Sequence, residues 1–296
     1  MYDRNGDYMN GKLIRILKSI IIFLLFVIIF AGAFLIYDFF KNQNLSTDET
    51  QSQRPNEFLF LLAGVDSTGE DTKTRTDTLM LVKLDETNKK IDMISIPRDS
   101  YVSINGNMNK INAAHSYGGI DLTMQVVRDF MGINLDKYLV LSFDAVIAGI
   151  DALGGMDVDI DQDVANAMQI NPGIHKMTGK EVLTYVRFRK GYTNADIGRI
   201  DTQQDFIKQF IKEVSKAENI SKLPSVYKAM NPHMKTNISL KTLAKLGFEF
   251  KSVNSDNINT VKLNGRGEYI NGISYYKIDP ASLEEIRNSY LKSFLR

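Results

Sequence analysis

Aspartate and arginine side chains recur where predicted strands of this chain begin or end. Asp66 follows one apolar run, Arg75-Thr76-Asp77 precedes a second, and Pro97-Arg98-Asp99 follows a third. Ligands of α/β proteins bind outside the ends of strands, so these charges are expected to converge on one crevice. The alternative is a set of solvated turn residues, because Asp, Thr and Pro are favoured in turns for backbone reasons.

A second group of polar side chains lies further along the chain, around two predicted helices. Arg187 and Arg189 end the first helix, and Arg199 lies one turn before Gln203 on the second. Guanidinium groups form paired hydrogen bonds with phosphate oxygens, and spare carboxylates bind a divalent cation that bridges to phosphate. The two groups together favour a diphosphate ligand over solvated turns.

Other classes of site fail on composition or spacing. The chain has no cysteine and only three histidines, without an HExxH pair, which argues against disulfide scaffolds, zinc sites and cysteine nucleophiles. Residues 173–180 do not match a phosphate loop, residues 265–270 lack the third glycine of a dinucleotide loop, and no GxSxG motif occurs.

Charge and the remaining polar residues give weaker indications. The 36 basic and 35 acidic residues leave a net charge of +1, which gives no indication of a nucleic-acid partner. Alternating aspartates over residues 157–163 predict a solvated strand face rather than a calcium site. For His115 a hydrogen bond is expected rather than a catalytic role.

The first 56 residues predict a membrane anchor and a tether. Residues 19–37 are apolar and uncharged, and a membrane-spanning helix needs about 20 such residues. A cleaved secretory signal is the alternative, but the apolar run continues past the small residues 31–33. Because basic residues precede the run, we expect residues 1–18 in the cytoplasm, residues 38–56 as an extracytoplasmic linker, and a single-pass protein of the cell membrane.

Residues 57–296 predict one α/β domain. Strands are expected over residues 58–65, 78–84, 91–96, 138–143, 158–160 and 260–263. Helices are expected over residues 122–130, 145–153, 179–188, 199–214, 240–253 and from 282 towards the C-terminus. Strands that alternate with helices imply a sheet covered by helices. Ser282 and Glu285 have the spacing of a capping box at the start of the last helix.

The order of these residues resembles the LytR-CpsA-Psr family over about residues 58–214. The resemblance rests on eight short motifs in sequence: Gly64-Val65-Asp66, Arg75-Thr76-Asp77-Thr78, Ser95-Ile96-Pro97-Arg98-Asp99, Lys110-Ile111-Asn112-Ala113, Gly118-Gly119, Asp151-Ala152-Leu153-Gly154-Gly155, Val186-Arg187-Phe188-Arg189 and Asp196-Ile197-Gly198-Arg199-Ile200 with Gln203-Gln204. The segment 272–280 is similar to the family's closing segment.

The resemblance implies a three-layer α-β-α sandwich with a central mixed sheet and an apolar pocket for a polyprenyl tail. It also implies a phosphotransferase that moves a glycopolymer (teichoic acid, capsule or another wall polysaccharide) from a polyprenyl diphosphate carrier to peptidoglycan. Asp66 and Asp77 would then hold Mg²⁺. The phosphates would be surrounded by Arg75, Arg98, Lys110, Arg187, Arg189, Arg199 and Gln203.

The catalytic candidates are Arg98, Asp99 and Asp77, and the general base is open between the two aspartates. The chain departs from the family at residues 67–69, which often include an arginine, and at Thr202, which is often arginine. Two other functions stay open, namely a hydrolase that uses water as the acceptor and a non-catalytic lipid-binding regulator of the envelope. A cytoplasmic tail of residues 1–18 leaves no room for a DNA-binding helix-turn-helix.

Overall fold

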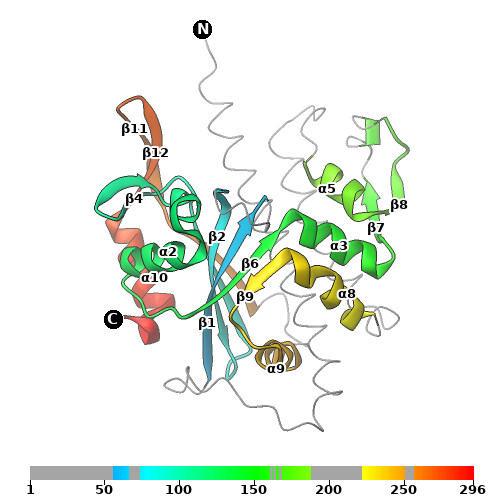
Figure 1. Cartoon of the computed structure of the whole chain (residues 1–296), viewed down its shortest axis with the longest axis horizontal. Helices are drawn as coiled ribbons and strands as arrows, with labels where there is room; N and C mark the ends of the chain where they lie inside the picture. Colours follow the sequence, from blue (N-terminus) through cyan, green and yellow to red (C-terminus); the bar gives the residue numbers. More distant parts are fainter. Residues whose placement is uncertain are drawn as a thin grey trace. The chain divides into compact units, whose positions relative to one another are not determined.

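The structure is a computed structural model, and its described residues form two compact units (Figure 1). The described residues are 56–66, 74–160, 162, 165–166, 169–187, 222–250 and 257–296. One unit takes its described residues from 144–232 and 243–248, and the other from 46–143, 233–242 and 249–296. That the two units form one catalytic domain over residues 57–296 stays a prediction.

The predicted anchor, residues 19–37, and the helix predicted over residues 199–214 lie outside the described residues. Within the part of the chain that is described, no helix is long and apolar enough to cross a membrane.

A six-stranded mixed sheet is the centre of the second unit, in the order β10-β3-β2-β1-β6-β9. β1, β2 and β3 pair antiparallel, β6 runs parallel to β1, β10 runs parallel to β3, and β9 pairs antiparallel with β6. The strands are β1 (Glu57–Val65), β2 (Thr76–Asp85), β3 (Lys90–Ile96), β6 (Lys137–Ser142), β9 (Met234–Thr236) and β10 (Ile258–Lys262). The strands predicted around residues 58–65, 78–84, 91–96, 138–143 and 260–263 are therefore confirmed.

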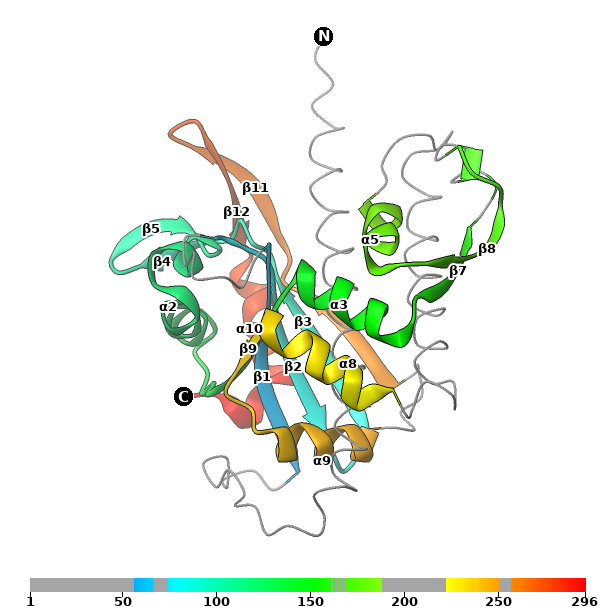
Figure 2. The same cartoon turned by 45° about the vertical axis from the view of Figure 1, so that its right-hand side comes forward.

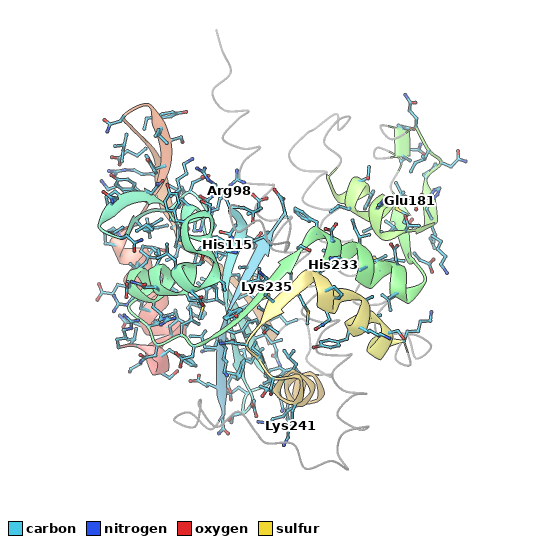
Figure 3. All side chains as sticks on the ribbon, in the orientation of Figure 1. Arg98, His115, Glu181, His233, Lys235 and Lys241 are labelled. Carbon is cyan, nitrogen blue, oxygen red and sulfur yellow. The ribbon has the colours of Figure 1, made fainter. Side chains whose placement is uncertain are left out.

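These directions give the sheet two chemically different ends. Val65, Thr76 and Ile96 meet at one end, which we call the Arg98 end because Arg98 follows β3 there. Glu57, Asp85 and Lys90 meet at the other end, which we call the Lys83 end. Figure 3 labels Arg98 and His115 near the first end and Lys241 of α9 (Leu240–Phe250) near the second.

Both faces of the sheet are buried and apolar. Leu61 and Leu81 point to one face, and Phe60 and Met80 point to the other, and all four side chains are fully buried. Near-continuous apolar runs such as those in β1 and β2 are typical of strands that are covered on both sides.

Helices α2 (Ala113–Met131) and α10 (Pro280–Tyr290) cover one face of this sheet (Figure 1). Met124 and Ile286 pack from these helices into a cluster that includes Leu61 of the sheet. α2 ends at Gly132, whose φ of 64° is the left-handed conformation that favours glycine. The helix predicted over residues 122–130 lies within α2.

The start of α10 differs from the expected capping box. Asp279, rather than Ser282, is the N-cap, and its side chain accepts a hydrogen bond from the backbone N–H of Ala281. Ser282 Oγ instead accepts from the backbone N–H of Asn264. Pro280 at the first helical position fixes the start three residues earlier than the spacing of Ser282 and Glu285 had indicated.

Two β-hairpins that the sequence analysis did not predict lie at the Arg98 end. β4 (Tyr101–Ile104) pairs with β5 (Asn107–Lys110), and β11 (Gly265–Ile270) pairs with β12 (Ile273–Ile278). Both turns are Asn-Gly with positive φ at both residues, at 105–106 and 271–272, as a type I′ turn requires. In Figure 2 the β11–β12 hairpin extends beyond the ends of β1 and β2, with β4–β5 beside it.

The first unit contains α3 (Phe143–Leu153), β7 (Met156–Ile160), β8 (Gly173–Met177), α5 (Gly179–Arg187) and α8 (Leu223–Met230). Gly179 packs against α3 so closely that a Cβ atom there would lie 2.5 Å from the Ile147 carbonyl oxygen. Gly173 begins a strand paired with β7, which agrees with the rejection of a phosphate loop.

Candidate functional site

Asp77 occupies an irregularity in the pairing of β1 with β2. Gly64 pairs with Thr78 and Val65 pairs with Thr76, so Asp77 is an extra residue of β2 between two pairs. A β-bulge of this kind bends its strand and re-aims a side chain, and bulges are frequent beside active sites. The bulge lies at the Arg98 end of the sheet.

Asp77 begins a chain of alternating charges. Arg98 Nη1 donates a hydrogen bond to Asp77 Oδ1 at 2.6 Å, and Arg98 Nε lies 3.7 Å from Asp99 Oδ2. Lys110 Nζ lies 3.1 Å from Asp99 Oδ1. The four side chains keep exposed fractions of 15% (Asp77), 31% (Arg98), 20% (Asp99) and 22% (Lys110). Two cations and two carboxylates are therefore held together while solvent, and hence a ligand, still reaches them.

The backbone around Arg98 is fixed by hydrogen bonds to its neighbours. Ser100 is fully buried, and both its backbone N–H and its hydroxyl donate to the Pro97 carbonyl. The Arg98 carbonyl accepts from the backbone N–H of Asn112 at 3.1 Å. Because the loop is held on both sides, Arg98 and Asp99 are presented in a defined position rather than on a free turn.

Several buried polar atoms around this site have no hydrogen-bond partner among the described residues. They are the hydroxyls of Thr74, Thr76 and Thr78, and Arg98 Nε. Buried polar groups are normally paired, and an unpaired group calls for a bound water, ion or ligand. Their concentration around Asp77 and Arg98 favours a polar ligand at this end of the sheet.

His115 supports the site through the backbone. Its Nδ1 lies 2.7 Å from the carbonyl oxygen of Thr74, in the segment that leads through Arg75 into β2. His115 thus forms the hydrogen bond expected from the sequence, and it fixes the approach to β2.

The structure places the other sequence-predicted residues as follows. Asp66 directly follows β1 and Arg75 directly precedes β2, so the pairing of Val65 with Thr76 makes them neighbours at the Arg98 end, and both are exposed. Arg187 is the last residue of α5, in the first unit. Arg189, Arg199 and Gln203 lie outside the described residues.

Asp66 and Asp77 are the two carboxylates for which the sequence predicts Mg²⁺ binding. Both offer carboxylate oxygens, the ligand type that Mg²⁺ takes, and adjacent strand ends bring them near each other. No group of three or more His, Cys, Asp or Glu suited to a metal is found in the described residues. Two carboxylates fit Mg²⁺ nevertheless, because this ion usually binds one or two carboxylates and takes further ligands from phosphates and water.

Aromatic residues that the sequence analysis did not consider lie beside Lys110. The rings of Tyr101 and Tyr275 are 4.7 Å apart, and Lys110 Nζ lies 5.9 Å from the centroid of Tyr275. Tyr276 donates its backbone N–H to the Asp99 carbonyl at 2.8 Å, which attaches β12 to the site. The two Asn-Gly turns were the available signal, since that dipeptide between strand-like segments indicates a hairpin.

Comparison with known proteins identifies the family. The family model LytR_cpsA_psr matches residues 34–292. The chain belongs to the LytR_cpsA_psr family. The resemblance stated from the sequence is thereby confirmed, and the mixed α/β fold with a central mixed sheet matches solved structures of the family.

Three comparisons describe its relatives. The polyisoprenyl-teichoic acid–peptidoglycan teichoic acid transferase TagV of Bacillus subtilis (strain 168) is 32% identical over 270 residues, which cover 86% of this chain and 69% of TagV. The crystal structure of B. subtilis TagV has a TM-score of 0.62 at 29% identity, covering 81% of this chain and 98% of that one. The structure of TagT bound to LI-WTA has a TM-score of 0.61 at 26% identity, covering 85% and 94%.

Proposed function

We propose that this protein is a glycopolymer phosphotransferase that attaches a teichoic acid, or a related wall polymer, from a polyprenyl diphosphate carrier to peptidoglycan. The observation that carries the proposal is the solvent-accessible chain of Asp77, Arg98, Asp99 and Lys110 at the end of the sheet. The names of the relatives, which are teichoic acid transferases, support the choice of polymer.

The cations of the site are proposed to bind the diphosphate. Arg98 and Lys110 are the described cations that converge there, and Arg75 enters from the adjacent strand end. The planar guanidinium of arginine donates paired hydrogen bonds to phosphate oxygens, whereas the lysine ammonium acts as a point charge. Arg187, Arg189, Arg199 and Gln203 are proposed as further phosphate contacts on the family resemblance alone.

Asp66 and Asp77 are proposed to hold Mg²⁺. The bound ion would neutralise charge on the phosphate oxygens. Asp77, which is proposed to bind Mg²⁺, accepts a hydrogen bond from Nη1 of Arg98, which is proposed to bind phosphate. This hydrogen bond positions both side chains. Fixed charges aimed at the phosphates stabilise the transition state more than mobile water does.

The transfer step moves one phosphodiester. An acceptor hydroxyl of the peptidoglycan glycan attacks the phosphorus that carries the glycopolymer, a new O–P bond forms, and the bond to the bridging oxygen breaks. Polyprenyl monophosphate leaves, and Arg98 and Lys110 stabilise charge on the two phosphates. We propose Asp99 as the acceptor of the hydroxyl proton, because Asp77 is a proposed metal ligand and a carboxylate that binds a metal ion is a poor base.

The remaining sequence expectations complete the proposal. Residues 19–37 anchor the protein in the cell membrane, and the catalytic part lies on the extracytoplasmic side, where peptidoglycan is found. A three-layer α-β-α sandwich is proposed because side chains on both faces of β1 and β2 are buried and apolar.

The test is product analysis with the full-length protein in detergent. The substrates are a polyprenyl-diphosphate oligosaccharide and an uncrosslinked peptidoglycan oligomer, with and without Mg²⁺, and all products are identified by mass spectrometry. We expect a phosphodiester-linked conjugate together with polyprenyl monophosphate. Free oligosaccharide phosphate would instead identify a hydrolase, and intact but bound substrate would identify a lipid-binding regulator.

A further inference from the structure

The two hairpins at the Arg98 end share one continuous face that begins at Asp99. Ser100 forms a parallel bridge with Tyr276, so Asp99, Tyr101 and Tyr275 all project to the side opposite Ser100. The ring contact between Tyr101 and Tyr275 agrees with this assignment. The hairpin partners Tyr101 and Lys110 pair with each other, which brings Lys110 to the same side.

This hairpin face continues outward along both hairpins. On β5, Met108 precedes Lys110 by two residues, and on β12, Ile273 precedes Tyr275 by two residues, so each pair projects to the same side. Met108 is 47% exposed and Ile273 is 49% exposed. Met108 lies about 7 Å along β5 from Lys110, and Ile273 lies about 7 Å along β12 from Tyr275. This spacing is long enough for one sugar ring beside the sugar that reacts at Asp99.

The exposed large apolar side chains among the described residues of the second unit lie in or beside the two hairpins. Met108 and Ile273 lie on the hairpin face itself. Tyr269 alternates to the opposite side of β11, and Tyr117 of α2 accepts a hydrogen bond from Asn109, which alternates to the other side of β5. Exposed apolar side chains beside a polar site are typical of a binding surface.

We propose that the hairpin face, formed by Tyr101, Met108, Lys110 and Ile273 above the buried Tyr275, binds the glycan strand of the peptidoglycan acceptor and directs its hydroxyl to Asp99. The proposal rests on the proposed transfer function. A glycan fits because the C–H faces of pyranose rings pack on aromatic and aliphatic side chains, while their hydroxyl and acetamido groups need polar partners at the edge. Ser103, Glu268 and Lys277 share the face and supply such partners.

The polarity of the hairpins favours a glycan over a lipid surface. The turns of both hairpins are polar Asn-Gly dipeptides, and Ile270 and Ile273 directly flank the second turn. Glu268 lies on the face itself, within 3.6 Å of Lys277 Nζ and 3.7 Å of Arg266 Nε. Insertion of this charged group into a bilayer would carry a desolvation cost, whereas the polar groups of a glycan can hydrogen-bond to it.

The test compares variants on the two sides of the same hairpin. Met108→Ser with Ile273→Ser removes apolar contacts from the hairpin face, and Tyr269→Ser is the matched control because Tyr269 is 79% exposed and alternates to the opposite side of β11. All three residues are exposed, so little loss of stability is expected. Full-length protein in detergent is assayed for binding of a labelled peptidoglycan oligomer and for transfer kinetics.

We expect the double variant to weaken oligomer binding and to raise the KM for the acceptor by roughly tenfold, with the KM for the lipid-linked donor and the kcat unchanged. Tyr269→Ser should behave as the wild type. Unchanged oligomer binding and acceptor KM in the double variant would overturn the inference while leaving the transfer function intact. If the wild type transfers nothing, the proposed function fails, and oligomer binding still decides the role of the face. A defect that occurs only in lipid vesicles, with normal oligomer binding, would overturn it in favour of a bilayer contact.

Discussion

Both ends of the central sheet carry a charged pair, but the pair of Lys83 with Asp92 at one end is buried, whereas the pair of Arg98 with Asp77 at the other is accessible. At the Lys83 end, Lys83 Nζ lies 3.1 Å from Asp92 Oδ2, and Asn259 Nδ2 donates to Asp92 Oδ1 at 2.6 Å. The side chain of Asp92 is 3% exposed and that of Lys83 is 11% exposed. Asp92 therefore has hydrogen-bonding partners on both carboxylate oxygens and almost no contact with solvent.

At the Arg98 end the same kinds of charge are arranged differently. Arg98 is 31% exposed, and its Nε and the nearby threonine hydroxyls are buried without hydrogen-bond partners. A buried charged cluster whose hydrogen-bonding groups are paired stabilises the fold. An accessible cluster with unpaired hydrogen-bond donors can instead bind a ligand. Charge alone does not mark a functional site; its accessibility and unpaired donors do.

Replacing Arg98 should give the largest functional effect. Arg98→Ala removes a fixed positive charge from the phosphate site, so the transfer rate should fall roughly 10²–10³-fold. Arg98→Lys should restore only part of the rate, since lysine cannot donate the paired hydrogen bonds of arginine. The check is the initial rate of conjugate formation, with the thermal midpoint as a control for folding. Full activity in Arg98→Ala would show that Arg98 does not bind the phosphates.

Replacing Lys83 should lower the stability of the fold and leave the transfer rate nearly unchanged. Lys83→Met leaves the buried Asp92 carboxylate without its closest cation, so the free energy of unfolding should fall by about 3 kcal/mol. Below the melting transition, the transfer rate should stay near that of the wild type. Denaturant unfolding measures the first quantity and the transfer assay the second.

A double variant sharpens this contrast. Lys83→Met with Asp92→Leu removes both buried charges and should recover much of the lost stability. Arg98→Met with Asp77→Leu at the other end should recover no activity. A double variant at the Lys83 end that is stably folded but does not transfer would contradict the separation of the two ends.

The proposed metal ligands give a smaller effect. Asp66→Asn removes one anionic ligand, so the Mg²⁺ concentration for half-maximal transfer should rise about tenfold, equal to about 1.4 kcal/mol. Removal of Mg²⁺ by a chelator should abolish transfer and leave the thermal midpoint nearly unchanged, because the Lys83 end contains no proposed metal ligand. An activity that is the same with and without chelator would remove the metal from the proposal.

The smallest predicted effect concerns pH. Burial raises the pKa of the Asp85 carboxyl, but hydrogen bonds from the Asn88 side chain and from the backbone N–H groups of Asn88 and Thr87 outweigh it, so the pKa lies below 3.8. This lowered pKa stabilises the fold above about pH 4, and the contribution is lost as the pH falls through the folded-state value. Asp85→Asn should flatten the loss of stability on acidification. If the free energy of unfolding of Asp85→Asn falls with pH below pH 4 as steeply as that of the wild type, the prediction is contradicted.

The sequence predicted the elements of the sheet well because their apolar runs are long and turn residues bound them. It also brought Asp77, Arg98 and Asp99 to strand ends, since Pro97 and the flanking threonines mark where strands stop. It did not predict the bulge at Asp77, because a bulge depends on the register of β1 against β2 rather than on either strand alone.

Lys83 illustrates the same limit at the other end of the sheet. A single lysine in an apolar strand gives no sign of its partner, and only the register of β2 with β3 places it opposite Asp92. The hairpin face was missed for a related reason. Tyr101 and Tyr275 are far apart in the sequence, and the bridge from Ser100 to Tyr276 brings their strands together.

The most direct test of the account is the affinity of the full-length protein for a polyprenyl diphosphate, measured for the wild type, Arg98→Ala and the double variant Lys83→Met with Asp92→Leu. The account predicts that Arg98→Ala weakens binding by at least about tenfold, whereas the double variant binds as the wild type does. Wild-type affinity in Arg98→Ala, or a comparable loss in a folded Lys83-end double variant, would contradict the claim that the Arg98 end alone is the phosphate site.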